Sequence, residues 1–335
     1  MTKPRILLVA TGGTIASAED GNGLTPQLTG EQLAGYVPQA AELADIDIVQ
    51  PMNIDSTNMR PADWQAIGDA ILAQYEDYDG FVVLHGTDTM AYTAAALSYL
   101  IQDSPRPIVL TGSQQPMGSP FTDARINLYQ SVLYATDPDS HDVAVVFGGK
   151  VVAGTRARKQ RTMSFNAFTS VNYPELALIR NDRIIRTAPA GSGDARAASE
   201  PRVYHDLDER VFVLKLTPEV NPSVFELLRR DYDAIILETF GVGGIPDTLH
   251  DAIFGWVDSG RTLVVTTQVP EEGLDLGVYE VGRAYAEHPG ILKVADMTCK
   301  ALVAKTMWVL GQTRESERLR ELFYRPVNCD RLPEA

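Results

Sequence analysis

The amino-acid sequence predicts an α/β fold made of two α/β domains with mainly parallel sheets, joined by a linker. Three observations lead to this prediction: short apolar runs recur along the chain, a helical pattern stands between them, and one segment rich in small residues interrupts the alternation. The length of 335 residues suits two domains, because a typical domain holds about 150 residues.

The strands are predicted from seven short runs that are β-branched and almost wholly apolar. Runs without polar alternation are typical of strands buried on both faces, as in parallel sheets. The runs are Arg5–Ala10, Phe81–Leu84, Pro107–Leu110, Val143–Phe147, Val211–Leu216, Ala234–Leu237 and Thr262–Thr266.

A helix is predicted between the first two runs, over Pro61–Tyr75. Proline suits the first helical turn. Apolar residues then recur at helical spacing and form one stripe: Trp64, Ile67, Ile71, Leu72 and Tyr75. Strands that alternate with helices indicate crossover connections, which favour an α/β fold.

The domain boundary is placed in Pro189–Pro201, which is rich in glycine, alanine and proline and has no apolar period. We therefore predict an N-terminal domain at 1–188 that carries the catalytic threonines, a linker at 189–209 and a C-terminal domain at 210–335.

The charge balance argues against two classes of partner. The formal net charge is -15 and the isoelectric point is about 4.8, so the surface repels nucleic-acid phosphates and anionic lipids. The short basic run Arg156–Arg161 is interpreted as a solvated or ion-paired face. We expect neither a nucleic-acid partner nor a membrane partner.

The sequence also favours the cytoplasm. The first apolar run is too short for a signal-peptide core, and no stretch approaches the about 18 apolar residues of a membrane span. The two cysteines, Cys299 and Cys329, form no CxxC pair, which fits a reducing compartment.

Polar turns follow three of the predicted strands directly. They are Thr11–Ile15, His85–Met90 and Thr111–Gln114. Ligands of open α/β sheets bind at the carboxyl ends of the strands, so these turns could form one polar pocket.

Each turn alone also has a structural interpretation. A Gly-Gly turn is often only a tight connection, threonine is a common cap residue, and His85 alone suggests a packed, hydrogen-bonded side chain. The dinucleotide and phosphate-loop patterns are absent, and the five histidines lack metal-ligand spacing. We therefore expect neither a catalytic metal nor a cofactor.

Together the motifs indicate nucleophilic catalysis. A threonine hydroxyl is a poor nucleophile unless a base takes its proton, and a desolvated lysine such as Lys159 can serve as that base. Asp88, beside Thr87, could orient the lysine or bind a cationic group of a substrate. These residues match the logic of a catalytic triad, although the sequence alone leaves open whether they meet in space.

The two threonine motifs, Thr11–Ile15 and His85–Met90, resemble the two signatures of bacterial-type L-asparaginases. Between them, Met52–Met59 resembles the substrate-binding loop of that family. The similarity extends nearly end to end, through Thr111–Gln114, Gly154–Lys159, Ser170–Tyr173 and Tyr279–Gly282. The lack of a leader points to the cytoplasmic type I branch.

The resemblance implies hydrolysis of L-asparagine to L-aspartate and ammonia through a threonine acyl-enzyme. By position, Thr14 would be the nucleophile. Thr87, Lys159 and Asp88 would form a second, triad-like group, and Asp88 would also hold the α-ammonium of the substrate.

The resemblance also implies which residues bind the substrate. Ser56, with Asp55 and Thr57, would bind the α-carboxylate and α-amino end. The main chain around Thr87 and Ser113 would contact the amide and its developing oxyanion, where one well-aimed donor is worth about 3–4 kcal/mol.

The sequence departs from the family pattern at two positions. A predicted lid at Ser17–Thr29 has Leu24 where many members have tyrosine, and Gly244 stands where many supply asparagine from a neighbouring subunit. Tyr279 is the candidate that would replace the lid tyrosine. The resemblance further implies a homo-oligomer, either dimer or tetramer, with Gly241–Gly244 and Gln268–Asp275 near the partner's site.

Two other functions stay open. An archaeal glutamyl-tRNA amidotransferase subunit shares these motifs but has an extra N-terminal domain, whereas the first motif here begins at residue 11. A non-catalytic sensor of asparagine or aspartate would not need two threonines and a lysine. Side activity on glutamine is undecided, since its one extra methylene is worth only about 1–3 kcal/mol in a pocket. Whether asparagine also binds a regulatory site is undecided as well.

Overall fold

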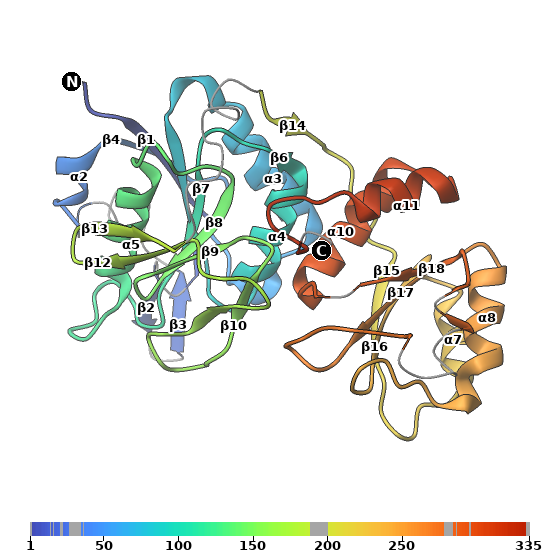
Figure 1. Ribbon diagram of the computed structural model, residues 1–335. Helices are drawn as coiled ribbons and strands as arrows, with labels where there is room; N and C mark the ends of the chain where they lie inside the picture. The colour runs from blue at the N-terminus through green and yellow to red at the C-terminus, as the bar shows by residue number, and fades with distance from the viewer. Residues whose placement is uncertain are drawn as a thin grey trace. The chain divides into compact units, whose positions relative to one another are not determined.

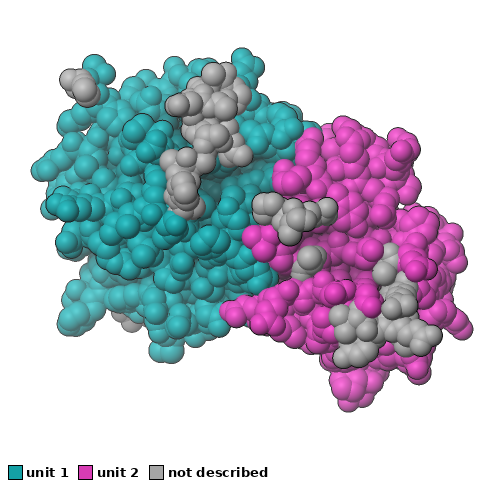
Figure 2. Space-filling view, in the orientation of Figure 1, with its two compact units in different colours: residues 1–205, 327–329 teal, residues 206–326, 330–335 magenta. Residues whose placement is uncertain are grey.

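The computed structural model describes residues 2–13, 15, 17–20, 23–26, 35, 37–187, 200–277, 284–285, 287–294 and 296–332, with the backbone alone for 17–20 and 23–26. The chain divides into two compact units (Figure 2). Unit 1 contains Met1–His205 and Val327–Cys329, and unit 2 contains Asp206–Pro326 and Asp330–Ala335.

Unit 1 contains an eight-stranded sheet with the order β13-β12-β9-β8-β7-β5-β1-β4 (Figure 1). The five strands from β8 to β4 are parallel, and three antiparallel strands extend the sheet beyond β8. The strands are β1 (Arg5–Ala10), β4 (Asp45–Val49), β5 (Gly80–Leu84), β7 (Ile108–Thr111), β8 (Val143–Phe147), β9 (Lys150–Ala153), β12 (Ala177–Arg180) and β13 (Arg183–Arg186).

The central strands are buried because helices cover both faces of the sheet. Every residue of β5, β7 and β8 is buried, as the unbroken apolar runs predict. Helices α2 and α5 pack on one face, and α3 and α4 lie on the other (Figure 1). The helices are α2 (Ala40–Leu43), α3 (Pro61–Leu72), α4 (Met90–Leu100) and α5 (Ala124–Ala135).

The described residues of unit 1 also form three two-stranded sheets and the short 3-10 helices η2 and η3. Strands β2 and β3 form an antiparallel hairpin within the predicted lid, and Leu24 pairs with Glu19 in its register. The elements are β2 (Ser17–Asp20), β3 (Gly23–Pro26), β6 (Ile101–Gln102), β14 (Arg202–Val203), β10 (Ala157–Lys159), β11 (Phe168–Ser170), η2 (Ser56–Asn58) and η3 (Tyr75–Asp77).

Unit 2 is built on a parallel four-stranded sheet with the order β15-β16-β17-β18. Helices α7 and α8 enclose the core on one face, where Phe225 and Trp256 pack among the strand residues, and α10 contacts β15 and β16. The elements are β15 (Val211–Lys215), α7 (Ser223–Leu228), β16 (Ala234–Thr239), η4 (Asp247–Leu249), α8 (His250–Asp258), β17 (Thr262–Thr267), β18 (Ile291–Lys293), α10 (Cys299–Gln312) and α11 (Ser316–Tyr324).

The two-domain α/β prediction is therefore confirmed. The linker was predicted at 189–209. Its residues 189–199 lie outside the described part, and its strand β14 pairs with β6 of unit 1. Val327–Cys329, placed by the sequence in the C-terminal domain, clusters with unit 1. In the described ranges, no helix combines the length and the apolar character that crossing a membrane requires.

Candidate active site

The three polar turns lie next to one another because their strands are neighbours in the sheet. The Thr11 amide donates to the Leu84 carbonyl at 3.0 Å, and the His85 amide donates to the Thr111 carbonyl at 2.8 Å. Strands β1, β5 and β7 run parallel, so all three turns leave the same carboxyl edge of the sheet.

Glycines allow two of these turns and the Ser56 loop to meet. Gly13 has φ +81°, and a Cβ there would lie 2.3 Å from the Gly86 nitrogen. A Cβ on Gly86 would lie 2.4 Å from Ser56 Oγ. These approaches are possible only without a side chain, so the backbone that precedes Thr14 contacts the backbone that precedes Thr87. Thr14 itself lies outside the described residues.

Thr87, Asp88 and Lys159 come together at this edge. Lys159 is the last residue of β10, and its Nζ lies 2.7 Å from Thr87 Oγ1 and 2.7 Å from Asp88 Oδ1. The pairing of β10 with β11 fixes the backbone of Lys159, which pairs with Phe168. The Lys159 side chain is 17% exposed and that of Asp88 is 60% exposed, so the cluster is open to solvent on the carboxylate side.

The Thr87 hydroxyl has a second partner. Thr87 is 5% exposed, and its Oγ1 lies 3.3 Å from Gln114 Oε1. With the Lys159 ammonium donating to Thr87, the threonine hydrogen points to Gln114. In this arrangement Lys159 is a proton donor to the Thr87 hydroxyl. Lys159 can act as a base toward Thr87 only after it has released a proton and the hydroxyl has turned toward it.

The proposed substrate loop is held by its own side chains. Asp55 caps the short helix η2: its Oδ1 accepts from the Thr57 amide and from Thr57 Oγ1, both at 2.9 Å. Ser56 is buried, and its carbonyl accepts a hydrogen bond from Thr89 Oγ1 at 2.7 Å. The loop is therefore tied to the turn after β5.

Asp123 is a supporting residue that the sequence did not reveal. This buried carboxylate accepts from the amides of Gln114 and Gln115 at 3.0 and 3.1 Å, and from Asn127 Nδ2 at 3.1 Å. Ser113, fully buried, donates to the Gln115 carbonyl at 2.6 Å. The carboxylate thus fixes the turn after β7. Its only sequence signal is an acid just before helix α5, which predicts a cap.

His85 has the structural role that the sequence suggested. It is fully buried, with Nδ1 2.7 Å from the Gly86 carbonyl and Nε2 2.8 Å from Thr93 Oγ1. Burial lowers the pKa of His85 to about 4, against a smaller opposing effect of the Gly86 carbonyl. The imidazole is therefore neutral at physiological pH, and it braces the turn that carries Thr87.

The remaining predictions fall elsewhere. Tyr279 and the Leu24 side chain lie outside the described residues. Gly244 belongs to unit 2, in a tight turn where the Phe240 and Gly244 amides donate to each other's carbonyls at 3.0 and 2.7 Å. In the ranges that the structure describes, no group of three or more His, Cys, Asp or Glu side chains is arranged to hold a metal ion.

Comparisons with known proteins agree on one family. The family model described as "Asparaginase, N-terminal" matches residues 5–190, and "Glutaminase/Asparaginase C-terminal domain" matches 210–323. The chain is 38% identical to L-asparaginase of Thermococcus kodakarensis over 96% of this chain and 98% of that protein. It is 33% identical to L-asparaginase 1 of Escherichia coli K12 over the full length of both.

A third relative has a different name. It belongs to the glutamyl-tRNA(Gln) amidotransferase of Aeropyrum pernix, and it is 35% identical over 96% of this chain, but the match covers 78% of that protein. This coverage leaves part of that relative without a counterpart in the present sequence.

Solved structures show the same relationship. The thermostable L-asparaginase from Thermococcus kodakarensis superposes with a TM-score of 0.89 at 35% identity, over 98% of this chain and all of that one. A structure titled a probable cytoplasmic L-asparaginase, from Campylobacter jejuni, gives a TM-score of 0.82 at 25% identity, over 96% of this chain and 99% of that one. Since both family models match in order and the relatives align nearly end to end, this chain belongs to the asparaginase family of amide hydrolases.

Proposed function

We propose that this chain hydrolyses L-asparagine to L-aspartate and ammonia through a threonine acyl-enzyme. The observation that carries the proposal is the cluster in which Lys159 Nζ lies 2.7 Å from both Thr87 Oγ1 and Asp88 Oδ1. Gly86, which directly precedes Thr87, lies against Gly13, which directly precedes Thr14 in the sequence.

In the first half-reaction, the Thr14 hydroxyl attacks the carbonyl carbon of the side-chain amide. The C–N bond then breaks, ammonia leaves with the proton it needs, and an ester on Thr14 remains. In the second half-reaction, water attacks that ester and releases L-aspartate. Positioned proton transfer typically contributes about 10²–10⁴-fold to such steps.

Lys159 and Thr87 are the proposed proton carriers. The ammonium donates to Thr87 Oγ1 in the structure, which suits delivery of a proton to the departing nitrogen. The reverse transfer, from Thr87 to neutral Lys159, would activate a hydroxyl or water for attack. Asp88, 2.7 Å from Lys159 Nζ, keeps the lysine aimed at the threonine.

Substrate binding is assigned to the turns around this cluster. Asp88 is more than half exposed, so its carboxylate could also meet the substrate α-ammonium. Ser56 offers its hydroxyl for the α-carboxylate. The Thr57 hydroxyl donates to Asp55 at 2.9 Å, so it would have to turn away from Asp55 to donate to the substrate. The main chain at Thr87 and Ser113 is proposed to bind the oxyanion, since Asp123 holds the turn after Ser113 rigid.

The test is release of ammonia and aspartate from L-asparagine by the purified protein, in buffer with EDTA. We expect turnover that EDTA does not reduce. No ammonia from asparagine would refute the proposal and leave the sensor function. Activity lost in EDTA and restored by a divalent ion would refute the metal-free chemistry.

The amidotransferase function has less support. The relative that carries this name extends beyond the match, whereas the two L-asparaginases align over 98% or more of their own lengths. Ammonia release from free asparagine, without any transfer-RNA substrate, separates the two functions.

We further propose that the active enzyme is a cytoplasmic homo-oligomer, a dimer at least. Phe121 and Met163, in loops of unit 1, are 85% and 84% exposed, and a subunit interface that covered them would remove their apolar surface from water. Light scattering on active enzyme should give at least twice the chain mass of 36.6 kDa. Full activity at the mass of a single chain would contradict this proposal.

A further inference from the structure

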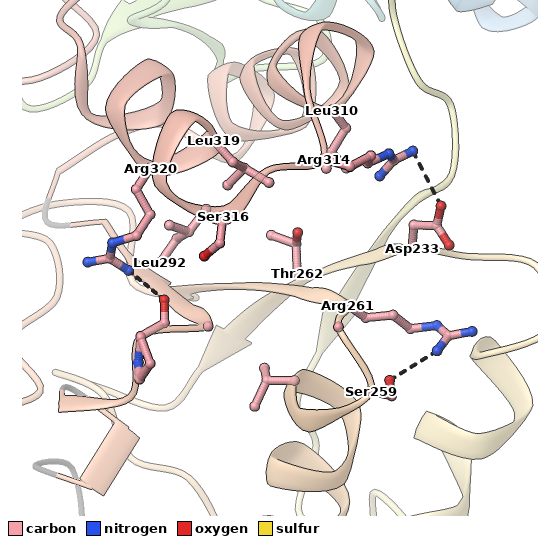
Figure 3. Close-up of a pocket in the computed structure, with 14 residues that line it drawn as sticks. Asp233, Ser259, Arg261, Thr262, Leu292, Leu310, Arg314, Ser316, Leu319 and Arg320 are labelled. Carbon is pink, nitrogen blue, oxygen red and sulfur yellow. Dashed lines mark hydrogen bonds and ion pairs between the residues drawn. The ribbon is translucent and has the colours of Figure 1, made fainter.

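Unit 2 contains a hollow at the amino-terminal edge of its sheet (Figure 3). Asp233 directly precedes β16, Thr262 begins β17, and Gly290 directly precedes β18, and all three line the hollow. Its volume is about 460 Å³, within the range of about 300–1,000 Å³ typical of small-molecule sites. The residues proposed for asparagine hydrolysis all belong to unit 1, so the hollow has no part in that chemistry as proposed.

Apolar side chains form part of the lining. They come from α8, β18, α10 and α11, and they are all at least nine-tenths buried. The residues are Val257, Leu292, Leu310 and Leu319. A hydrocarbon group placed against them would lose its contact with water, which is favourable.

The charged residues of the lining are three arginines and one aspartate, and the aspartate is already neutralised. Asp233 Oδ2 lies 2.9 Å from Arg210 Nη1 and 3.3 Å from Arg314 Nη2. Both arginines also pair with Asp208. Two cations and two anions thus form a closed network, and Arg314 contributes little net charge to the hollow.

Arg261 and Arg320 differ from Arg314, because neither has a carboxylate partner among the described residues. Arg261 donates to Ser259 Oγ and to the Arg229 carbonyl, both at 3.0 Å. Arg320 donates to the Pro289 carbonyl at 2.8 Å. These neutral acceptors hold both guanidinium groups in place without cancelling their charge.

Figure 3 shows how these groups are arranged. In this view Arg261 and Arg320 lie on either side of Thr262 and Ser316, whose hydroxyls add further polar groups, and Leu292 and Leu319 lie between. A positively charged hollow stands out on a chain whose net charge is -15. An anion entering it would meet two fixed cations and an apolar surface together.

We propose that this hollow binds a small organic acid, with its carboxylate on Arg320 and its hydrocarbon part on the leucines. A guanidinium group is weakly hydrated and matches the two oxygens of a carboxylate, so arginine binds this group well. The apolar lining explains why an acid with a hydrocarbon body fits better than inorganic phosphate.

The test uses phenylbutyrate as the probe, with isothermal titration calorimetry on the full-length protein. Phenylbutanol lacks the charge and inorganic phosphate lacks the hydrocarbon, so these two compounds are the matched controls. We expect saturable binding of one phenylbutyrate per chain, and binding of each control at least about tenfold weaker, since a hydrogen bond to a charged group is worth about 1.5–3 kcal/mol.

Variants locate the site. Arg320→Gln should weaken phenylbutyrate binding at least about tenfold, and Ser316→Trp, at an exposed position of the lining, should block the hollow without disturbing the core. Arg230→Gln is the control, because Arg230 is 87% exposed and outside the lining. Circular dichroism of each variant checks that it is folded.

Three results would overturn the proposal. One is the absence of saturable binding to the folded wild-type protein. Another is binding of phenylbutanol or phosphate as tight as that of phenylbutyrate. The third is unchanged phenylbutyrate affinity in both Arg320→Gln and Ser316→Trp, which would put the ligand elsewhere on the chain.

Discussion

Replacement of Lys159 by methionine tests the proposed proton carrier while keeping the length of the side chain. It removes two contacts of 2.7 Å, one to Thr87 Oγ1 and one to Asp88 Oδ1. Because the Asp88 carboxylate is 60% exposed, the ion pair should contribute no more than about 1 kcal/mol to stability. The loss of a positioned acid or base should reduce kcat by about 10²–10⁴-fold.

The assay is steady-state ammonia release from L-asparagine, together with thermal unfolding. We expect kcat to collapse while the melting temperature falls by only a few degrees, about 2–4 °C per kcal/mol for a domain of this size. Lys159→Arg is the matched control: it keeps the charge near Asp88 but cannot act as a base, so it should recover stability but not kcat. Near-wild-type turnover in Lys159→Met would refute the role of Lys159. A large loss of stability in Lys159→Met with little loss of kcat would show that Lys159 is structural.

Further predictions concern the groups that shape the site. Gly86→Ala should raise KM sharply because its Cβ would lie 2.4 Å from Ser56 Oγ, whereas Gly255→Ala, whose nearest neighbour is 3.6 Å away, should leave the kinetics unchanged. Asp123→Asn should lower kcat, and it should lower the free energy of unfolding by about 2–3 kcal/mol, because three amide groups lose a charged acceptor. An Asp123→Asn variant with the stability and kinetics of the wild-type protein would contradict this role of Asp123. The pKa of His85 is lowered from 6.5 to about 4, so the unfolded chain binds the extra proton between these values. Stability should therefore rise by as much as about 3 kcal/mol from pH 4 to pH 6.5 and level off above; an unchanged pH dependence of denaturant unfolding in His85→Gln would contradict this.

The sequence predicted seven parallel strands because their burial leaves a direct mark, but it missed the parallel edge strands β4 and β18. Runs such as Val143–Phe147 contain no polar residue, and this run forms β8 with the same bounds. The antiparallel strands were not predicted. Arg183–Arg186, for example, forms the edge strand β13 with alternating exposed and half-buried residues, and so short a run has little apolar signal.

The site was predictable where side chains are neighbours of a strand end, and not where they arrive from elsewhere. Thr87 and Asp88 lie in the turn that directly follows β5. Lys159 lies about seventy residues further along the sequence, and the pairing of β10 with β11 fixes its position. The basic run was interpreted as a solvated or ion-paired face, and Arg156 is not solvated. Arg156 is fully buried, and its Nε donates to the Cys329 carbonyl at 2.5 Å, a contact across 173 residues that no local pattern reveals.

The most direct test of the proposed chemistry is ammonia release from L-asparagine by Thr87→Val and Thr87→Ser beside the wild-type protein. Valine keeps the shape of threonine and removes only the hydroxyl that lies 2.7 Å from Lys159 Nζ, and serine restores that hydroxyl. We predict that Thr87→Val loses at least about 10²-fold in kcat with an unchanged fold, and that Thr87→Ser keeps most of the activity. Wild-type turnover by Thr87→Val would contradict a catalytic role for the Thr87, Asp88 and Lys159 cluster.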